Sequence, residues 1–236
     1  MIDACIRSVG EPQVQRCLLS AKDQVIPFSN IIHVDGIVPE SESLKALLQQ
    51  VKSEWMMLID GDMILYDYAV VITQHHIGME EDNSVVEYQF GLYDPFIKRI
   101  INSCRVSKVE AIKSSKLKDW MGCDLNVVRT MENKGMKCIK LWKLKSPVVI
   151  GTHFENPDEF QIFVRYYHAG ILRTPNTMEL LTDLYKSTKD QKYDFAMKAL
   201  SYGLNKRYKE YPGSRNVNYD RKEFEEFKES VVLKQS

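Results

Sequence analysis

Trp55–Met56–Met57–Leu58–Ile59–Asp60–Gly61–Asp62–Met63–Ile64–Leu65 is an apolar run that two carboxylates and a glycine interrupt. The large apolar residues before Asp60 predict a strand that is buried on both faces. Burying a carboxylate costs several kcal/mol unless it is paired or bound to a metal. Two carboxylates at the end of a core strand therefore indicate a function for Asp60 and Asp62.

The spacing of the two aspartates suits a divalent cation. Residues two apart lie on the same side of an extended chain, and Gly61 lets the backbone turn or a ligand approach closely. Carboxylates at the carboxyl end of a central strand bind hard cations, with water or phosphate completing the coordination shell. The alternative is a strand followed by an acidic turn, because Asp-Gly is a common turn dipeptide. Burial favours the metal site.

The residues before this stretch predict alternating strands and helices. Residues 2–9 and 31–35 have strand composition, and helices are expected over about 12–24 and 41–51. The order strand-helix-strand-helix-strand is typical of a parallel sheet covered by helices. Because parallel strands end at the same edge, we expect Asp35, at the end of the second strand, to lie on the edge that carries the aspartate pair.

The rest of the chain predicts a larger α/β domain and a helical extension. Strands are expected at residues 85–93, 104–112 and 146–150, and a helix should begin near Asp124 and end at Gly135. From Pro157 to about Leu204 the apolar spacing is helical, and Phe224 and Phe227 indicate a short amphipathic helix within the charged segment 205–236. The expected organisation is an α/β domain over residues 1–156 and a helical extension over 157–236 that packs on it.

The composition excludes several classes of function. With 32 basic and 32 acidic residues the net charge is zero, so no global field favours nucleic acid, and we expect no nucleic-acid partner. The five cysteines form no C-x-x-C pair, which argues against a zinc ribbon or a disulfide framework and for a reducing compartment. The charged amino terminus does not fit a signal peptide, and no apolar stretch reaches the length of a membrane span. We expect a cytoplasmic protein, with peripheral attachment to the inner face of a membrane left open.

The three strands and the Asp60–Gly61–Asp62 motif together resemble a GT-A glycosyltransferase, most similar to the large family-2 group. The resemblance covers roughly residues 2–154. It implies a Rossmann-like, mostly parallel central sheet flanked by helices. It also implies that the D-x-D motif binds Mn²⁺ or Mg²⁺, which holds the diphosphate of a nucleotide-diphospho-sugar.

The resemblance assigns donor and metal roles to four residues. Asp60 and Asp62 match the D-x-D motif and would bind both the donor and the metal. Asp35 matches the carboxylate that contacts the nucleotide base in relatives. His153, just after the last expected strand, resembles the histidine that completes the metal shell in some members. From the residues alone, Asp35 could simply cap the turn before Gly36, and His153 could equally be a hydrogen-bonded loop histidine.

A fifth residue, Asp124, is the candidate catalytic base. Cys123–Asp124–Leu125–Asn126–Val127 is similar to a helix start of the family, E-D-x-D/N-hydrophobic, whose second acid removes the acceptor proton in inverting members. Cys123 stands where the family has glutamate, and Asp119 is a candidate substitute. Without the resemblance, Asp124 would be interpreted as a helix N-cap.

The resemblance implies a hexosyltransferase-type enzyme that moves a sugar to a hydroxyl of a saccharide or a lipid-linked saccharide, with inversion favoured over retention. The metal would neutralise the leaving diphosphate. One alternative is a magnesium-dependent phosphatase of the haloacid-dehalogenase type, in which Asp60 would be the nucleophile. That family carries its motif on the first strand, whereas two strand–helix units come first here. The other alternative is an inactive GT-A-like scaffold, which Cys123 favours and the intact aspartate pair disfavours.

Three other histidines are weaker candidates. His75 and His76 are adjacent, and adjacent side chains point apart on a helix or a strand, so a shared metal site is not expected. His168 follows Tyr166 and Tyr167 on an expected helix, and we expect it to be packed there.

Overall fold

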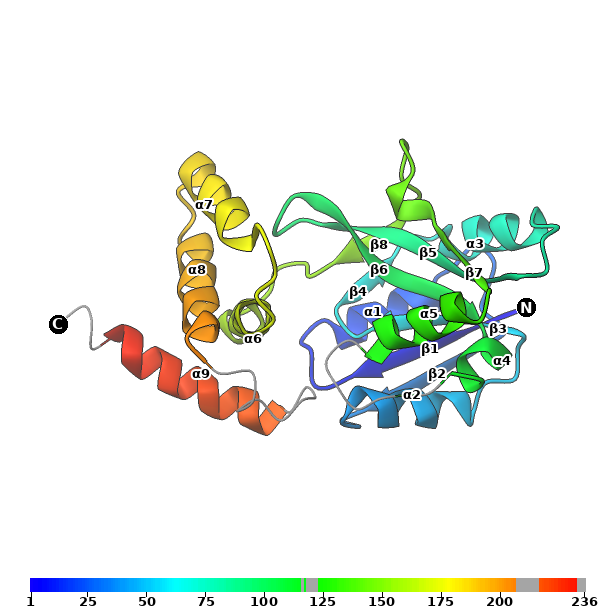
Figure 1. Ribbon diagram of the computed structural model, residues 1–236, viewed down its shortest axis with the longest axis horizontal. Helices are drawn as coiled ribbons and strands as arrows, with labels where there is room; N and C mark the ends of the chain where they lie inside the picture. The colour runs from blue at the N-terminus through cyan, green and yellow to red at the C-terminus, as the bar shows by residue number, and fades with distance from the viewer. Residues whose placement is uncertain (116, 118–122, 207–216, 233–236) are drawn as a thin grey trace. The chain divides into compact units, whose positions relative to one another are not determined.

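The computed structural model describes residues 1–115, 117, 123–206 and 217–232. The chain divides into two compact units, Met1–Glu155 and Asn156–Ser236, and each is described by itself (Figure 1). The first unit is a mixed sheet covered by helices, and the second consists of helices among the residues described. None of the described helices is long and apolar enough to cross a membrane.

The sheet of the first unit runs in the order β2-β1-β3-β6-β5-β8-β4, with β7 paired to β5 outside this path. Its strands are β1 (Ile2–Ser8), β2 (Asn30–Asp35), β3 (Trp55–Asp60), β4 (Met63–Leu65), β5 (Val85–Asp94), β6 (Arg99–Lys108), β7 (Lys137–Lys140) and β8 (Val149–His153). The pairings β1–β2, β1–β3, β5–β7 and β5–β8 are parallel, and β3–β6, β5–β6 and β4–β8 are antiparallel. Parallel pairs predominate, as expected.

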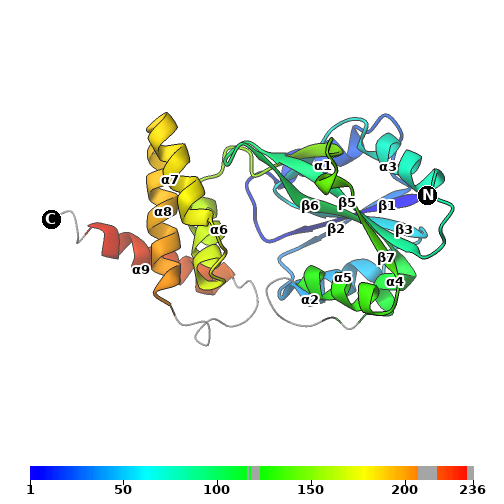
Figure 2. The same ribbon diagram turned by 45° about the horizontal axis from the view of Figure 1, so that its top comes forward.

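Helices cover both faces of this sheet, as Figure 2 shows. They are α1 (Val14–Lys22), α2 (Glu40–Leu48), α3 (Ala69–Gly78), α4 (Val109–Lys113) and α5 (Cys123–Asn133), with a 3₁₀ turn η1 at Leu141–Lys143. One buried cluster joins α1 and α3 to the side chains of one face, Ala4, Met57 and Ile59 among them. A second cluster joins α2, α4 and α5 to the opposite face, which includes Cys5 and Met56. Because apolar residues point to both faces of β1 and β3, these strands need helices on both faces of the sheet.

The structure differs from the sequence expectations at several elements. The opening stretch is two strands, because the chain turns at Gly61, and β4 lies at the far end of the sheet path from β2. The alternating segment 104–112 continues as a strand only to Lys108, α4 begins at Val109, and β7 was not predicted. The last strand is shifted toward the carboxyl end, so that His153 is its final residue.

A buried carboxylate fixes the amino-terminal ends of the first strands. Asp3 is fully buried and accepts hydrogen bonds from the backbone N–H groups of Lys52 and Ser53, at 2.8 and 3.1 Å. The Ser53 hydroxyl, at 2.7 Å, and the Asn30 amide, at 2.9 Å, complete the set. Burial raises the pKa of Asp3, but these hydrogen bonds outweigh it and hold the pKa below its usual value. The carboxylate thereby joins β1 to β2 and to the chain entering β3.

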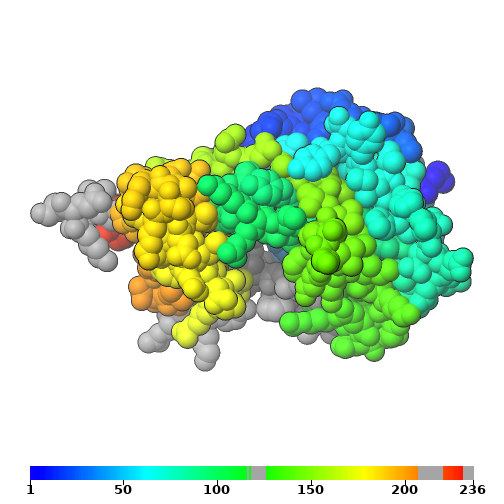
Figure 3. All heavy atoms as spheres, turned by 90° about the horizontal axis from the view of Figure 1, so that it is seen from above, coloured from blue at the N-terminus to red at the C-terminus, as the bar shows by residue number. Residues whose placement is uncertain are grey.

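The second unit packs α6 (Glu159–Ile171), α7 (Thr177–Thr188), α8 (Gln191–Leu204) and α9 (Val217–Val232). The helices α7 and α8 form the yellow-to-orange surface in Figure 3. A capping box at Asp158 starts α6, because its side chain accepts from the Gln161 backbone N–H while the Gln161 side chain bonds back. The core is aromatic, and Phe163 stacks on Tyr167 and contacts Phe224 and Phe227 of α9.

Two glycines allow α6 and α8 to cross at close range. A methyl group on Gly170 would lie 2.3 Å from the Leu200 carbonyl oxygen, and one on Gly203 would lie 2.2 Å from the Tyr167 carbonyl oxygen. Both clashes are with backbone, which does not move aside as a flexible side chain does. Only glycine at both positions therefore permits this crossing.

We expect Gly203→Ala to destabilise the second unit by about 1–3 kcal/mol or more, since the added methyl group forces the two helices apart. Chemical denaturation of the full chain, followed by circular dichroism, measures the effect. Gly78→Ala is the matched control, because a methyl group at that helix end meets nothing within 4 Å. If Gly203→Ala unfolds at the same denaturant concentration as Gly78→Ala, the described crossing is wrong.

Candidate active site

The carboxyl ends of β1, β2 and β3 form one edge of the sheet. The parallel register pairs Ser8 with Asp35 and Arg7 with Asp60. The Nε of Arg7 donates to Asp60 Oδ1, and the Arg7 side chain is largely buried. Glu40 at the start of α2 lies 3.9 Å from the same guanidinium. This edge carries two of the carboxylates singled out from the sequence, Asp35 and Asp60.

Asp35 lies at the exposed end of β2 and is bonded to the neighbouring strand. The Ser8 hydroxyl donates to Asp35 Oδ1, and the Ser8 oxygen lies 2.8 Å from Nε2 of His33. Ser8 itself is buried. Asp35 therefore presents a solvent-facing carboxylate that Ser8 orients, which is the arrangement a polar contact with a ligand needs.

Gly61 brings the D-x-D turn against the loop between β1 and α1. A methyl group on Gly61 would lie 3.0 Å from Glu11 Oε2 and 3.0 Å from the Ser8 Cβ. Glu11 is held in turn by the Val9 backbone N–H, which donates to it at 2.7 Å. The turn thus packs closely on this loop, and the direction of the chain beyond β3 follows from that packing.

Asp62 is separated from Asp60 by the turn and meets a different partner. It is 7% exposed, and its Oδ2 lies 3.4 Å from Nε2 of His153. The antiparallel register of β4 and β8 pairs Met63 with His153, and the Phe154 backbone N–H donates to the Asp62 carbonyl oxygen at 3.2 Å. Asp62 Oδ1 is buried and has no hydrogen-bond partner among the described residues. A buried carboxylate oxygen without a partner is costly unless a ligand compensates it.

His153 has a second carboxylate on its other ring nitrogen. Its Nδ1 lies 3.3 Å from Oδ2 of Asp94, the last residue of β5. Asp94 is fully buried, and its Oδ1 accepts from the backbone N–H groups of Phe96 and Ile97, at 2.9 and 3.1 Å. The three side chains form a line in the order Asp62–His153–Asp94.

The donor set fits a divalent cation that takes only part of its shell from the protein. No group of three or more His, Cys, Asp and Glu side chains is placed to surround a metal ion in the part of the chain that the structure describes. Asp62 and His153 offer one carboxylate and one imidazole, and Asp62 Oδ1 is available to a ligand. Mg²⁺-type sites commonly use one or two protein carboxylates and complete the shell with substrate phosphates and water. The residues present therefore fit such a metal.

The structure does not test the roles predicted for Asp60, Asp124 and Asp119. The Asp60 carboxylate is bonded to Arg7, so its role as a metal ligand remains a prediction. Asp124 is the second residue of α5, but its side chain, like that of Cys123, lies outside the described part of the structure. Asp119 lies outside the described residues altogether.

Sequence reasoning missed Arg7 and Asp94. Arg7 is a charge inside a strand, and the only signal for a role was the cost of burying a guanidinium in the core. Asp94 precedes a proline. Its Oδ1 caps the turn that follows β5, while its Oδ2 faces His153. Neither partner is identifiable without the register of the sheet, because each bond joins residues more than fifty positions apart.

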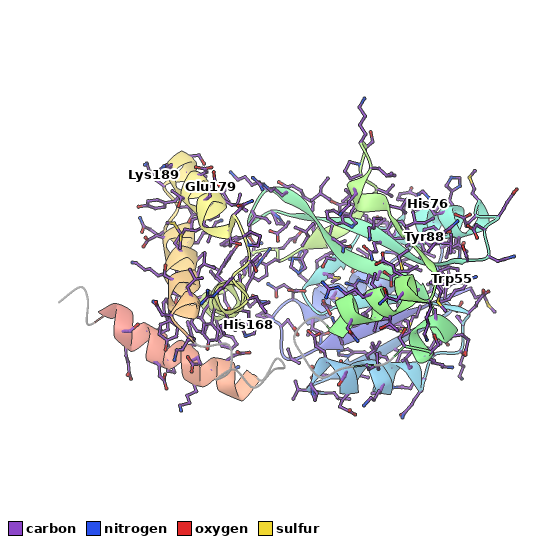
Figure 4. All side chains as sticks on the ribbon, in the orientation of Figure 1. Trp55, His76, Tyr88, His168, Glu179 and Lys189 are labelled. Atoms are coloured by element: carbon purple, nitrogen blue, oxygen red, sulfur yellow. The ribbon has the colours of Figure 1, made fainter. Side chains whose placement is uncertain are left out.

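His76 and His168, labelled in Figure 4, contact neighbouring side chains, whereas His75 is exposed. His76 contacts Tyr88, with ring centroids 6.4 Å apart, and burial together with the neighbouring His75 lowers its pKa. The rings of His75 and His76 meet edge-on at 5.7 Å. In the second unit, His168 is buried, and its Nε2 lies 2.9 Å from Asp220 Oδ1.

The chain resembles solved glycosyltransferase structures. The mannosyltransferase PcManGT from Pyrobaculum calidifontis, in complex with GDP-Man and Mn²⁺, matches with a TM-score of 0.52 and 11% identity, over 86% of this chain and 73% of that one. Glucosyl-3-phosphoglycerate synthase from Mycobacterium tuberculosis, in complex with Mg²⁺ and UDP, matches with a TM-score of 0.49 and 10% identity, over 66% and 72% of the two chains. Staphylococcus aureus TarS 1–349 matches with 0.48 and 8%, over 86% and 71%.

Comparison of the sequence alone gives no such match. No family model matches the chain, and no curated protein does. At these identities the structural likeness concerns the fold. The predicted fold class, a GT-A type α/β fold with a Rossmann-like sheet, is confirmed.

Proposed function

We propose that the protein is a metal-dependent glycosyltransferase that moves a hexosyl group from a nucleotide-diphospho-sugar to an acceptor hydroxyl with inversion. The observation that carries the proposal is Asp62, whose buried Oδ1 has no partner among the described residues and whose Oδ2 faces His153. This pair lies beyond the central strand β3 of a GT-A fold. In open α/β sheets, ligands bind beyond the carboxyl ends of the strands.

Asp62 and His153 would hold Mn²⁺ or Mg²⁺, with Asp60 as the third candidate ligand. When bound, the metal supplies positive charge that stabilises the leaving diphosphate. Asp60 and Asp35 would contact the donor nucleotide, and Arg7 fixes the direction of the Asp60 carboxylate. The Mn²⁺ and GDP-Man in the complex of PcManGT support this choice of ligands.

Asp124 would act on the acceptor. The acceptor hydroxyl must lose its proton as the sugar is transferred, and a positioned carboxylate is a suitable general base. In the inverting reaction the acceptor oxygen attacks the anomeric carbon, the bond to the diphosphate breaks, and the proton passes to Asp124. A saccharide or a lipid-linked saccharide is the proposed acceptor, and a cytoplasmic location, with or without attachment at a membrane, belongs to the same proposal.

A thermal-shift panel tests the donor and the metal together. The chain is mixed with nucleotide sugars of different bases and sugars, each with Mn²⁺ and with a chelator. One donor at about a hundred times its Kd should stabilise the protein by about 2.7 kcal/mol, which shifts the Tm by several degrees, and only with Mn²⁺. A phosphatase or an inactive scaffold predicts no protection by any nucleotide sugar, and that result across the panel would overturn the proposal.

A further inference from the structure

The hydrogen bonds of Asp94 determine which ring nitrogen of His153 carries the proton. The two oxygens of Asp94 have separate partners, since Oδ1 accepts from Phe96 and Ile97 while Oδ2 faces Nδ1 of His153. Asp94 is fully buried and bonded as a carboxylate, and so its Oδ2 is an acceptor. A proton on Nδ1 satisfies that contact, and a neutral imidazole with Nδ1 protonated has its lone pair on Nε2.

The lone pair on Nε2 then faces Asp62. The Oδ2 of Asp62 lies 3.4 Å away, and it too is an electron-rich atom. Two acceptors at this distance repel each other unless a cation or a proton lies between them. A metal-bound histidine usually donates its other N–H to a carboxylate or a carbonyl oxygen, which fixes the tautomer. The geometry around His153 has that form.

We propose that Asp94 is a positioning residue that holds His153 in the Nδ1-protonated tautomer and so presents the Nε2 lone pair to the divalent cation. The proposal rests on the proposed function for the identity of the cation. The tautomer itself is independent of that function and is measurable without metal. Asp94 ends β5, and it would act on the cation through His153, the last residue of β8.

Asp94→Asn is the sharpest test, because the turn dictates how the new side chain lies. The amide oxygen takes the place of Oδ1 and keeps accepting from Phe96 and Ile97, which leaves the NH₂ group facing His153. A donor at that position requires Nδ1 to accept, and the proton then moves to Nε2. We expect the two-bond ¹H–¹⁵N spectrum of the metal-free protein, recorded at alkaline pH so that the imidazole is neutral, to show the Nδ1-H form in the wild type and the Nε2-H form in Asp94→Asn.

Mn²⁺ titration, followed by electron paramagnetic resonance in the presence of GDP or UDP, gives the second readout. Asp94→Asn should weaken Mn²⁺ binding about 10–100-fold, the usual effect of losing a partner behind a metal ligand. Asp82→Asn is the matched control. Its Oδ1 likewise accepts a backbone N–H, from Ser84 at 2.8 Å, but it lies in an exposed turn before β5. The control should bind Mn²⁺ as the wild type does.

The outcomes separate this inference from the proposed function. An Nε2-H ring in the wild type, or the same tautomer in both proteins, would overturn the role of Asp94 even if Mn²⁺ binds. A tautomer change with weakened Mn²⁺ binding supports both. If the wild type binds no Mn²⁺ and Asp94→Asn still changes the tautomer, Asp94 sets the tautomer of His153 but the proposed metal-dependent function is contradicted. Unchanged Mn²⁺ affinity after a tautomer change would remove His153 from the metal shell and overturn the inference.

Discussion

Replacing Asp62 by asparagine should abolish metal-dependent donor binding while leaving the fold intact. The substitution keeps the shape of the side chain but removes the negative charge that attracts the cation. The loss should exceed the roughly 10–100-fold that follows from removing a partner behind a ligand, because Asp62 is itself proposed to touch the metal. Isothermal titration of the selected nucleotide sugar with Mn²⁺ measures it.

Asp62→Asn should weaken donor binding but should not lower the stability of the metal-free protein. The buried Oδ1 of Asp62 has no partner among the described residues, and an uncompensated buried charge destabilises a folded protein. Without metal, the variant should therefore be at least as stable as the wild type in denaturant. Asp67→Asn, at an exposed loop position, is the control and should change neither property. Wild-type donor affinity in Asp62→Asn would show that the metal is bound elsewhere or not at all.

Asp124→Asn should slow sugar transfer about 10²–10⁴-fold, the usual effect of losing a general base, with donor binding unchanged. A residue that only stabilised the first turn of α5 through its charge would change the stability by about 0.3–1 kcal/mol and leave the transfer rate unaltered. The experiment compares initial rates of transfer at saturating donor with the donor Kd from titration.

The matched control for Asp124→Asn lies on the same helix. Glu132→Gln removes a carboxylate from α5 that is paired with Lys140 at the surface, at 2.9 Å, and it should transfer sugar at the wild-type rate. Transfer by Asp124→Asn at the rate of the Glu132 variant would remove Asp124 from the mechanism. A raised donor Kd with an unchanged rate at saturating donor would instead assign Asp124 to donor binding.

The amino-terminal half of the sheet was predictable because its signals are local. Each of the first three strands is a short apolar run that ends in a polar residue, with a helix of clear apolar spacing between consecutive strands. Parallel strands joined by helices end at one edge, and so the sequence alone indicated that Asp35 and Asp60 share it. The helices of the second unit were predictable from their spacing for the same reason.

The site beyond β3 was only partly predictable, because it depends on pairings between distant strands. Asp60 and Asp62 were treated as one pair on an extended chain, but the turn at Gly61 gives them different partners, Arg7 and His153. Asp94 faces His153 because β5 and β8 are neighbours in the sheet. The segment 104–112 alternates as a strand should, yet α4 begins at Val109, where burial against α2 and α5 outweighs the local pattern.

The most direct measurement is ³¹P and ¹H NMR of the wild-type protein with the nucleotide sugar that the thermal-shift panel selects. With Mg²⁺, which unlike Mn²⁺ is diamagnetic and does not broaden the phosphate signals, we expect release of the nucleoside diphosphate and of a sugar whose anomeric configuration is inverted, either free by slow hydrolysis or on an added acceptor. A chelator or Asp62→Asn should stop the release. Nucleoside diphosphate released at the same rate with a chelator, or no release from any nucleotide sugar that binds, would contradict a metal-dependent glycosyltransferase.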